Sequence, residues 1–397
     1  MARPFPLVLF ALFESCWLAS TVVRSPPLRY TTFILALSIA AYLPFTTTGD
    51  PVSDYFIGSV LFTHLFTIAD YALITDVHRE LRITGQTQHP IPESAPFVQR
   101  LKWGVRLCLA TRGVRWEHEP REVLRARMAS PGTTRWRFVL RQMMMLGYYL
   151  LLQDIASIYN RASPVHHAGG PPLDSRPFPW RVVDLFFFAV INFGGQNLLH
   201  TVYSIISVGL GFSDPQDWVN VFGYRGDAYT LRRFWGRTWH QFLRRWVLTH
   251  GKFLARTLGL RKGTNASAYT QLYTAFLLSA LLHVLSDYMV HRSLAPWASG
   301  SLRFFLLQPL AITVEDFVLF VGRKMGLGRE GKRDIRLLGG WISMVRVLGY
   351  VWVTGWFVCT YSRWWSPMIR GGMVEKTLNL KWSVVLGVWK GEWRQGR

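Results

Sequence analysis

Residues 270–290, TQLYTAFLLSALLHVLSDYMV, form an apolar stretch of the length that crosses a bilayer. A transmembrane helix needs about 20 predominantly apolar residues, because each residue adds about 1.5 Å across a hydrocarbon core about 30 Å thick. His283 and Asp287 are the side chains in this stretch that can carry charge near neutral pH. The stretch therefore predicts a membrane helix with a histidine near the middle of the bilayer.

Similar apolar stretches recur along the chain and predict an all-α fold, a polytopic transmembrane helical bundle. Half of the 397 residues are hydrophobic and only 17% are charged, too few charges for an ordinary water-facing surface. Mean hydropathy is only +0.16, so the apolar residues must be concentrated between polar loops. A shorter stretch at 382–389 predicts an interfacial segment or a ninth crossing. We expect about eight crossings, near residues 5–23, 28–45, 54–74, 138–159, 182–211, 270–290, 302–321 and 345–365.

Positive charge alternates between the loops, and this alternation predicts the side on which each loop lies. The loop after residue 75 and the loops at 213–269 and 322–336 are rich in Arg and Lys, whereas those at 46–54 and 162–175 are nearly free of them. Because Arg and Lys concentrate in cytoplasmic loops, we expect the basic loops in the cytosol. We expect the protein in the endoplasmic reticulum membrane. The net charge of +22 then indicates lipid headgroups or a phosphorylated cosubstrate as partners, and no nucleic acid.

The same pattern divides the chain into three parts. We expect a three-helix membrane segment at 1–75, a basic cytosolic loop at 76–137 and a core at 138–397. The three cysteines are far apart and form no Cys-x-x-Cys pair, so neither a disulfide framework nor a cysteine-ligated metal is indicated. No internal repeat is evident, which weighs against transporter folds built from duplicated halves.

Ionisable side chains inside apolar stretches are costly, so each one marks a candidate site. Most lie near the end of a predicted crossing, where an interfacial or interhelical hydrogen bond explains them at least as well as catalysis. His283 is different, because Ser279, Ser286 and Asp287 share its neighbourhood at helical spacing. Its imidazole could tie helices together, or it could act as a general base near pH 7. The candidates are Asp70, Asp154, Asp184, His200, His283, Asp287, Glu315 and Asp316.

A run of aromatic and basic residues, TLRRFWGRTWHQFLRRW at 230–246, predicts an amphipathic helix in the headgroup region. The aromatic face would lie in lipid and the arginines in water. This interpretation explains every residue in the run except His240, which adds little to a basic face. The aromatic face would hold Trp235, Trp239, Phe242 and Trp246, and the basic face would hold Arg233, Arg237, His240 and Arg244.

A third feature is a polar pair inside the apolar stretch FFLLQPLAITVEDFV. Gln308 and Glu315 are seven residues apart, so they share one helix face. Facing the helix of His283, they would build a polar interior. They could equally be structural links between helices.

These blocks, in this order and spacing, resemble the wax synthase-like branch of the membrane-bound O-acyltransferase superfamily. That branch includes fungal acetyltransferases of terpenoid and mycotoxin biosynthesis. The resemblance covers about residues 213–365 and depends on FWGRTWHQFLRRW after DPQDW, then LLSALLH, then LQPLAITVEDF. It implies that His283 is catalytic and that His240 occupies a second essential position. Ser279 and Ala280 stand where the family often has glycine, a conservative departure.

The resemblance also implies a reaction, for which we expect no metal. We expect no acyl-enzyme either, because the sequence has no Ser or Cys nucleophile motif. An acyl-CoA would enter from the cytosol and a hydrophobic alcohol from the bilayer, and His283 would take the hydroxyl proton. His240 would position a substrate or stabilise the oxyanion. We expect acetyl-CoA and a terpenoid-type alcohol; the alternatives are a long-chain wax synthase or a non-enzymatic transporter or scaffold. The remaining expected site residues are Arg237, Arg244 and Trp235 for acyl-CoA, and Asp287, Gln308 and Glu315 for a supporting polar interior.

Overall fold

The computed structural model describes most of the chain, and the described part is almost entirely helical. The two named strands have two residues each and pair in parallel. The all-α prediction is therefore confirmed. The described residues are 3–85, 91, 94–120, 128–130, 132–293, 300–325, 335–377 and 382–393, apart from the side chains of 335–343 and 377.

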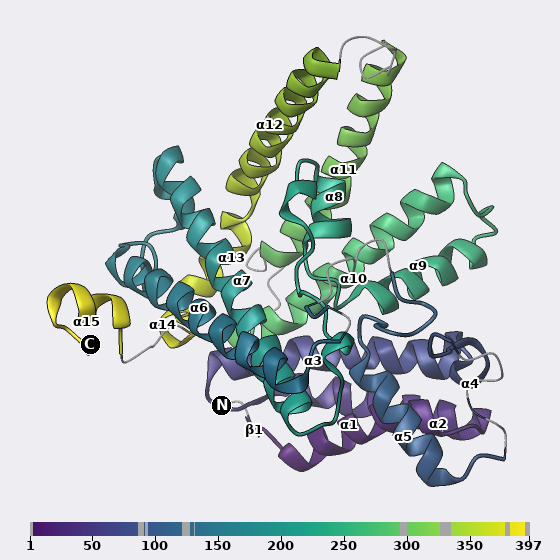
Figure 1. Ribbon diagram of the computed structural model, residues 1–397. Helices are drawn as coiled ribbons and strands as arrows, with labels where there is room; N and C mark the ends of the chain where they lie inside the picture. The colour runs from purple at the N-terminus through teal and green to yellow at the C-terminus, as the bar shows by residue number, and fades with distance from the viewer. Residues whose placement is uncertain are drawn as a thin grey trace. The chain divides into compact units, whose positions relative to one another are not determined.

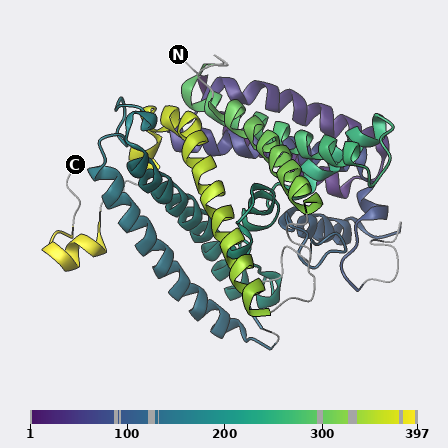
Figure 2. The same ribbon diagram turned by 90° about the horizontal axis from the view of Figure 1, so that it is seen from above.

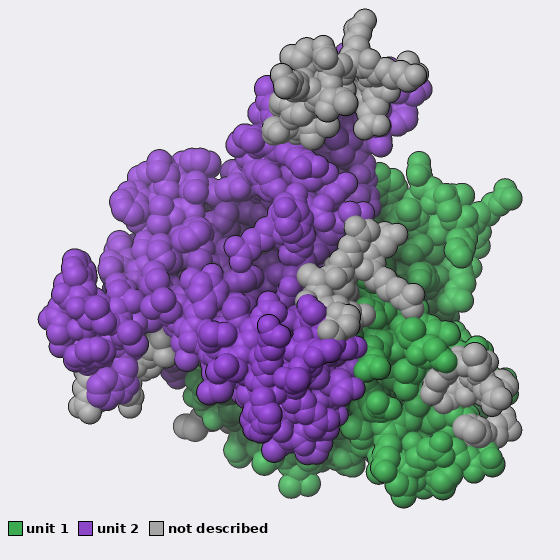
Figure 3. Space-filling view, in the orientation of Figure 1, with its two compact units in different colours: residues 1–121, 242–306 green, residues 122–241, 307–397 purple. Residues whose placement is uncertain are grey.

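The chain forms two compact units, coloured separately in Figure 3. Unit 1 comprises residues 1–121 and 242–306, and unit 2 comprises residues 122–241 and 307–397. Each unit is thus assembled from two separate parts of the sequence. The predicted division into three consecutive parts stays a prediction.

Unit 1 consists of helices from the N-terminal third of the chain and from residues 242–306. Within it, α3 and α9 both pack against α10, and α1 packs against α2 and α5. Figure 1 labels its α-helices and β1. The elements of unit 1 are β1 (Arg3–Pro4), α1 (Leu7–Val22), α2 (Pro26–Tyr42), η1 (Leu43–Phe45), β2 (Thr46–Thr47), α3 (Pro51–Ala69), η2 (Asp70–Ile74), α4 (Val77–Glu80), α5 (Phe97–Leu109), α9 (Arg244–Thr257), α10 (Asn265–His291) and the start of α11 (Gly300–Lys324).

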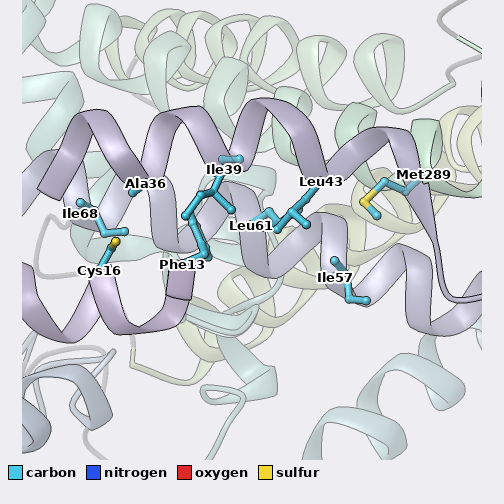
Figure 4. Close-up of a cluster of buried hydrophobic side chains, with 10 residues drawn as sticks. Phe13, Cys16, Ala36, Ile39, Leu43, Ile57, Leu61, Ile68 and Met289 are labelled. Carbon is cyan, nitrogen blue, oxygen red and sulfur yellow. The ribbon is translucent and has the colours of Figure 1, made fainter. Parts of the chain in front are cut away.

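The core of unit 1 is a cluster of apolar side chains where α1, α2, α3 and α10 meet (Figure 4). Between membrane helices, close packing contributes more than removal of apolar surface from water, since lipid is itself apolar. Ala36 and Ala40, one turn apart on α2, are small enough to let neighbouring helices approach. The cluster holds Phe13, Cys16, Ala36, Ile39, Ala40, Leu43, Ile57, Leu61, Ile68 and Met289.

The contact between α3 and α10 is unusually close at Gly58. A Cβ atom there would lie 2.8 Å from Ser286 Cα, so a side chain could fit only if the helices moved apart. Ser59 Oγ and Ser286 Oγ are hydrogen-bonded at 2.8 Å beside this contact. Near the start of α3, Asp54 accepts a hydrogen bond from Arg292, which follows α10, at 3.1 Å. These contacts fix the first turns of α3 against the second half of α10.

Unit 2 contains the antiparallel pair α6 and α7, which lie side by side in Figures 1 and 2. Gly194 on α7 leaves room for the side chain of Gln153 on α6, which donates a hydrogen bond to Ile191 O at 3.1 Å. The elements are α6 (Arg135–Ala162), η3 (Leu173–Ser175), α7 (Phe178–Gly209), η4 (Pro215–Asp217), η5 (Arg225–Asp227), α8 (Leu231–Arg233), η6 (Phe234–Thr238), most of α11, α12 (Ile335–Thr360), α13 (Ser362–Arg370), α14 (Met373–Thr377) and α15 (Val384–Lys390).

Among the described residues, five helices are long and apolar enough to cross a membrane. They correspond to the predicted crossings near 28–45, 54–74, 182–211, 270–290 and 302–321. The apolar helices Leu7–Val22 and Met344–Thr360 are shorter, and α6 is long but carries several arginines. The total of eight crossings stays a prediction. The five helices are Pro26–Phe45, Pro51–Ile74, Phe178–Gly209, Asn265–His291 and Gly300–Lys324.

The C-terminal elements differ in part from the predicted stretches. The stretch predicted near 345–365 ends as a helix at Thr360, and α13 begins at Ser362. Helix α15 has seven residues, which extend only about 10 Å at about 1.5 Å per residue. It is too short to cross a hydrocarbon core. Its exposed Trp389 favours the interfacial alternative over a ninth crossing.

Candidate active site

His283 lies on α10 with a tyrosine hydroxyl at one edge of its ring and a phenyl ring against one face. Its Nδ1 atom is 2.8 Å from the Tyr55 hydroxyl on α3. The ring stacks on Phe305 of α11, with centroids 4.4 Å apart and planes 7° from parallel. All three residues belong to unit 1. The orientation of the imidazole is therefore defined by its neighbours.

The polar helix face predicted around His283 is present in unit 1. Ser286 bonds to Ser59, and the buried Asp287 accepts a hydrogen bond from Ser301 Oγ at 2.5 Å. Ser301 is one turn before Phe305 on α11, so this bond fixes the segment that carries the stacked ring. Asp287 thus anchors the start of α11 in unit 1, and its supporting role at the site stays a prediction.

The predicted single helix over 230–246 is wrong. The chain forms α8, then the π-helical turn η6, and then an extended residue at Trp239 with ψ of 154°. Helix α9 begins only at Arg244. π-Helical turns are rare and occur frequently at functional sites.

Hydrogen bonds from the Gln241 side chain and from a preceding loop stabilise the interrupted helix. The end of a helix leaves carbonyl groups that need other donors. Gln241 Nε2 donates to the carbonyl oxygens of Trp235 and Trp239, at 3.2 and 2.6 Å, and the Gly223 amide donates to Thr238 O at 2.9 Å. These partners satisfy the freed carbonyls. Helical periodicity in the sequence cannot reveal them.

The aromatic residues of the run also do not form one lipid-facing stripe. Trp246 is 2% exposed and packs with Val247, Leu278 and Leu282 inside unit 1. Trp235 belongs to unit 2, where its indole N–H is hydrogen-bonded. The interpretation of 230–246 as a lipid-anchoring helix is therefore wrong.

Gln308 on α11 binds the segment 231–241, which we call the block. Its side chain is fully buried, and its Oε1 atom accepts hydrogen bonds from two indoles. The donors are Trp235 Nε1 at 3.2 Å and Trp356 Nε1 of α12 at 3.1 Å. Gln308 therefore links the π-helical turn to α12.

Glu315, two turns further along α11, holds the start of α8. Its Oε1 atom accepts from the Leu231 amide at 2.8 Å and from Trp352 Nε1 at 3.0 Å, and Oε2 accepts from the Arg232 amide at 3.1 Å. A carboxylate that accepts several N–H donors is well satisfied when buried. Asp316 adds an ion pair with the Arg232 guanidinium. The predicted polar pair on α11 thus fastens the block that contains Trp235.

The two candidate histidines belong to different units. His240 lies in unit 2, with its ring 5.3 Å from Trp239 and 6.4 Å from Phe222. The chain passes into unit 1 directly after Gln241. His283 is in unit 1, as described above.

The arginines expected to bind acyl-CoA are also divided between the units. Arg237 lies in the last turn of η6 in unit 2 and Arg244 begins α9 in unit 1, and both are half-buried. Burial lowers the pKa of Arg244. Nearby in unit 1, Arg112 lies over the Phe242 ring at 5.2 Å, and burial lowers its pKa to about 10. Unit 1 therefore holds two cations partly removed from water.

The other ionisable residues singled out from the sequence link segments within one unit. This is the alternative to catalysis considered for them. No group of three or more His, Cys, Asp or Glu side chains in the described part of the chain is placed to hold a metal ion. The contacts are Asp70 with Arg245 at 3.1 Å, Asp154 with the Val385 amide at 3.0 Å, Asp184 with Arg176 at 2.8 Å, Asp316 with Arg232, and the His200 ring with the Trp218 ring at 4.9 Å.

The structure adds site residues that the sequence reasoning missed. Trp352 and Trp356 are one turn apart on α12, a spacing that could have suggested a shared face. Tyr55 and Phe305 carried no such signal. Tyr55 is separated from His283 by 228 residues, and only the packing of α3 on α10 brings them together.

Helices long enough to span a bilayer, one of them carrying a histidine held by aromatic residues, define a membrane-embedded helical protein with a candidate intramembrane base. The sequence profile of the Membrane bound O-acyl transferase family matches residues 218–307, which include His240 and His283. No solved structure shows a significant match.

Two fungal relatives match the chain over nearly its whole length. Acetyltransferase ple2 of Rhodocybe pseudopiperita is 38% identical over 396 residues, covering 100% of this chain and 99% of the relative. Acetyltransferase eriL of Hericium erinaceus is 35% identical over 394 residues, covering 99% and 98%. The similarity includes the N-terminal half, which lies outside the resemblance at about 213–365. The chain belongs to the membrane-bound O-acyltransferase family and is an acyltransferase.

Proposed function

We propose that the protein transfers an acetyl group from acetyl-CoA to a hydroxyl of a terpenoid-type secondary metabolite. His283 carries this proposal, because its imidazole lies on an apolar helix with its orientation defined by Tyr55 and Phe305. The names of the two full-length relatives support acetyl as the transferred group. The resemblance to fungal terpenoid acetyltransferases supports the acceptor class.

In the proposed reaction the acceptor oxygen attacks the thioester carbonyl carbon while His283 Nε2 takes the hydroxyl proton. The tetrahedral intermediate then collapses. The carbon–sulfur bond breaks, and the imidazolium returns the proton to the departing CoA sulfur. The products are the acetate ester and free CoA, and the histidine ends in its starting state.

The other site residues receive supporting roles in the proposal. His240 positions a substrate or stabilises the oxyanion, as the family resemblance implies. Arg237 and Arg244 bind the phosphates of CoA, with Trp235 beside them in the sequence block. The partial burial of both arginines supports anion binding, because a cation partly removed from water interacts more strongly with a phosphate.

We also propose that the basic loops face the cytosol, with the protein in the endoplasmic reticulum. Single cysteines at exposed Lys262 and Ala168, in a variant without the three native cysteines, test the topology in sealed microsomes. The cysteine at 262 should react with an impermeant reagent added outside, and the one at 168 only after permeabilisation. The opposite pattern would overturn the proposed topology.

The decisive experiment is His283→Asn in purified, detergent-solubilised enzyme. Asn keeps a hydrogen-bonding side chain but removes the base, so turnover of acetyl-CoA with a terpenoid alcohol should fall by about 10² to 10⁴. His291→Asn, at the end of the same helix, is the matched control and should retain wild-type turnover. Turnover near wild type in His283→Asn would reject His283 as the base.

The choice of acyl donor is tested with the same preparation. Acetyl-CoA and palmitoyl-CoA are compared at equal concentration with a terpenoid alcohol and with a long-chain alcohol. Preference for acetyl-CoA and the terpenoid supports the proposal. Preference for palmitoyl-CoA and the long-chain alcohol would instead identify a wax synthase, with His283 still serving as base.

A further inference from the structure

Tyr55, on the N-terminal helix α3, donates to or accepts from the candidate base His283 over 2.8 Å. We propose that Tyr55 is a positioning residue that sets the tautomer and the basicity of His283. The inference rests on the proposed role of His283 as general base. It assigns a function to the N-terminal part of the chain, which lies outside the family-profile match at 218–307.

The contacts around Tyr55 show that its position is fixed by the fold. One turn further along α3, Gly58 permits backbone contact with Ser286, and Ser59 bonds to the same serine. One residue before Tyr55, the Asp54 carboxylate accepts hydrogen bonds from Arg292 and from the hydroxyl groups of Thr47 and Thr48. The tyrosine is therefore held on both sides by links that do not involve His283.

The direction of the Tyr55 hydrogen bond decides what His283 can do. A neutral imidazole carries one proton, so only one ring nitrogen can accept another. If the Nδ1–H group donates to the Tyr55 oxygen, Nε2 carries the lone pair and can act as a base. If Nδ1 carried the lone pair instead, Nε2 would hold the proton and could only donate. A general base at Nε2 therefore requires Tyr55 to act as the acceptor.

This arrangement also makes His283 a stronger base. When His283 takes the acceptor's proton, the Nδ1–H group of the resulting imidazolium is still bonded to the Tyr55 oxygen. A hydrogen bond to the charged form stabilises it and favours proton uptake. Phe305 covers one ring face and offers no competing hydrogen-bonding group on that side.

Tyr55→Phe tests the inference, because it removes the hydroxyl and keeps the ring. Turnover should fall about tenfold to a hundredfold, the contribution of one hydrogen bond to a charged group, while the KM for acetyl-CoA stays within about twofold. The acid limb of the kcat–pH profile should move to lower pH, because the imidazolium has lost an acceptor. Tyr288→Phe on α10 is the matched control and should change neither quantity.

A second variant keeps the test independent of folding. Fluorotyrosine incorporated at position 55 preserves the packing and weakens the phenol oxygen as an acceptor. It should move the acid limb in the same direction as Tyr55→Phe, by a smaller amount. A shift of the acid limb with unchanged thermal stability supports the positioning role of Tyr55, because a purely structural tyrosine would leave the pH profile unchanged.

The outcomes separate this inference from the proposed function. If both Tyr55 variants keep wild-type turnover and pH profile while His283→Asn is inactive, Tyr55 has no positioning role and the proposed base stands. If His283→Asn remains active, the proposed function fails first, and the Tyr55 inference fails with it.

Discussion

The neighbourhood of His283 and the block at 231–241 are held in contrasting ways. His283 is hydrogen-bonded to the Tyr55 hydroxyl and stacked on the Phe305 ring. The block is fastened to α11 by the Trp235 indole, which donates to Gln308, and by the Leu231 and Arg232 amides, which donate to Glu315. Trp356 and Trp352 of α12 donate to the same two acceptor side chains. The first arrangement orients a group that must change its protonation state. The second fixes a backbone geometry that a regular helix would not adopt.

The two regions should therefore respond differently to substitution, one by loss of activity and the other by loss of stability. Loss of a proton-transfer group should remove activity and spare the fold, as expected for His283→Asn. Loss of a buried acceptor that serves several donors should destabilise the fold itself, because each donor left without a partner costs free energy. The following variants test that separation, from the largest expected effect to the smallest.

Glu315→Ala should have the largest effect, on stability and activity together. It leaves two backbone amides and the Trp352 indole without their acceptor, a loss of about 3 kcal/mol. The melting temperature in detergent should fall by roughly 5–10 °C. Asp316→Asn is the neighbouring control: its ion pair with Arg232 is more exposed, so the effect should be below about 1 kcal/mol. Equal effects of the two changes would show that Glu315 is not a main support of the block.

Gly58→Ala should lower turnover through geometry alone. The added methyl group would meet Ser286 Cα at 2.8 Å, so α3 must move away from α10 and carry Tyr55 with it. A displacement near 1 Å at a catalytic group can cost about 10²-fold in rate. Steady-state kinetics provide the measurement. Gly147→Ala on α6, where nothing lies within 4 Å, should leave turnover unchanged. Wild-type turnover in Gly58→Ala would show that the close contact does not position the site.

Arg237→Ala and Arg244→Ala should each raise the KM for acetyl-CoA several-fold and change kcat less. The reason is that a phosphate contact is made equally in the ground state and the transition state. The effect should shrink at high salt, which screens the wild-type attraction. Arg261→Ala, an exposed residue in the same basic region, is the control. An unchanged KM in both variants would show that these arginines do not bind acetyl-CoA.

The smallest effect concerns pH and the loop that joins α6 to α7. Burial and the charge of Arg176 lower the pKa of His166 to about 4, although Asp184 lies 3.6 Å away, because Arg176 already pairs with that carboxylate. In the unfolded chain the pKa of a histidine is about 6.5. The free energy of unfolding is therefore highest above about pH 6.5 and declines as the pH falls toward 4. The expected decline between pH 7 and 5.5 is about 1 kcal/mol. His166→Asn should reduce this slope in thermal unfolding scans; an unchanged slope would contradict the assignment.

Much of the architecture could be predicted from sequence because its signals are local. Apolar length predicted the membrane helices, and the spacing of LLSALLH and LQPLAITVEDF predicted which residues share a helix face with His283 and Gln308. The prediction failed at 230–246, where an amphipathic pattern suggested one helix. There, Gln241, Gln308 and Glu315 provide hydrogen-bond partners that stabilise a π-helical turn and an extended residue instead.

The sequence by itself determined that this is a helical membrane protein and that a histidine sits within one of its apolar helices. Only the tertiary structure decided what that histidine touches. Helical periodicity reports neighbours three or four residues apart, whereas Tyr55 and His283 are 228 residues apart. They meet because a glycine and two serines let α3 and α10 pack closely, and close packing depends on both surfaces at once.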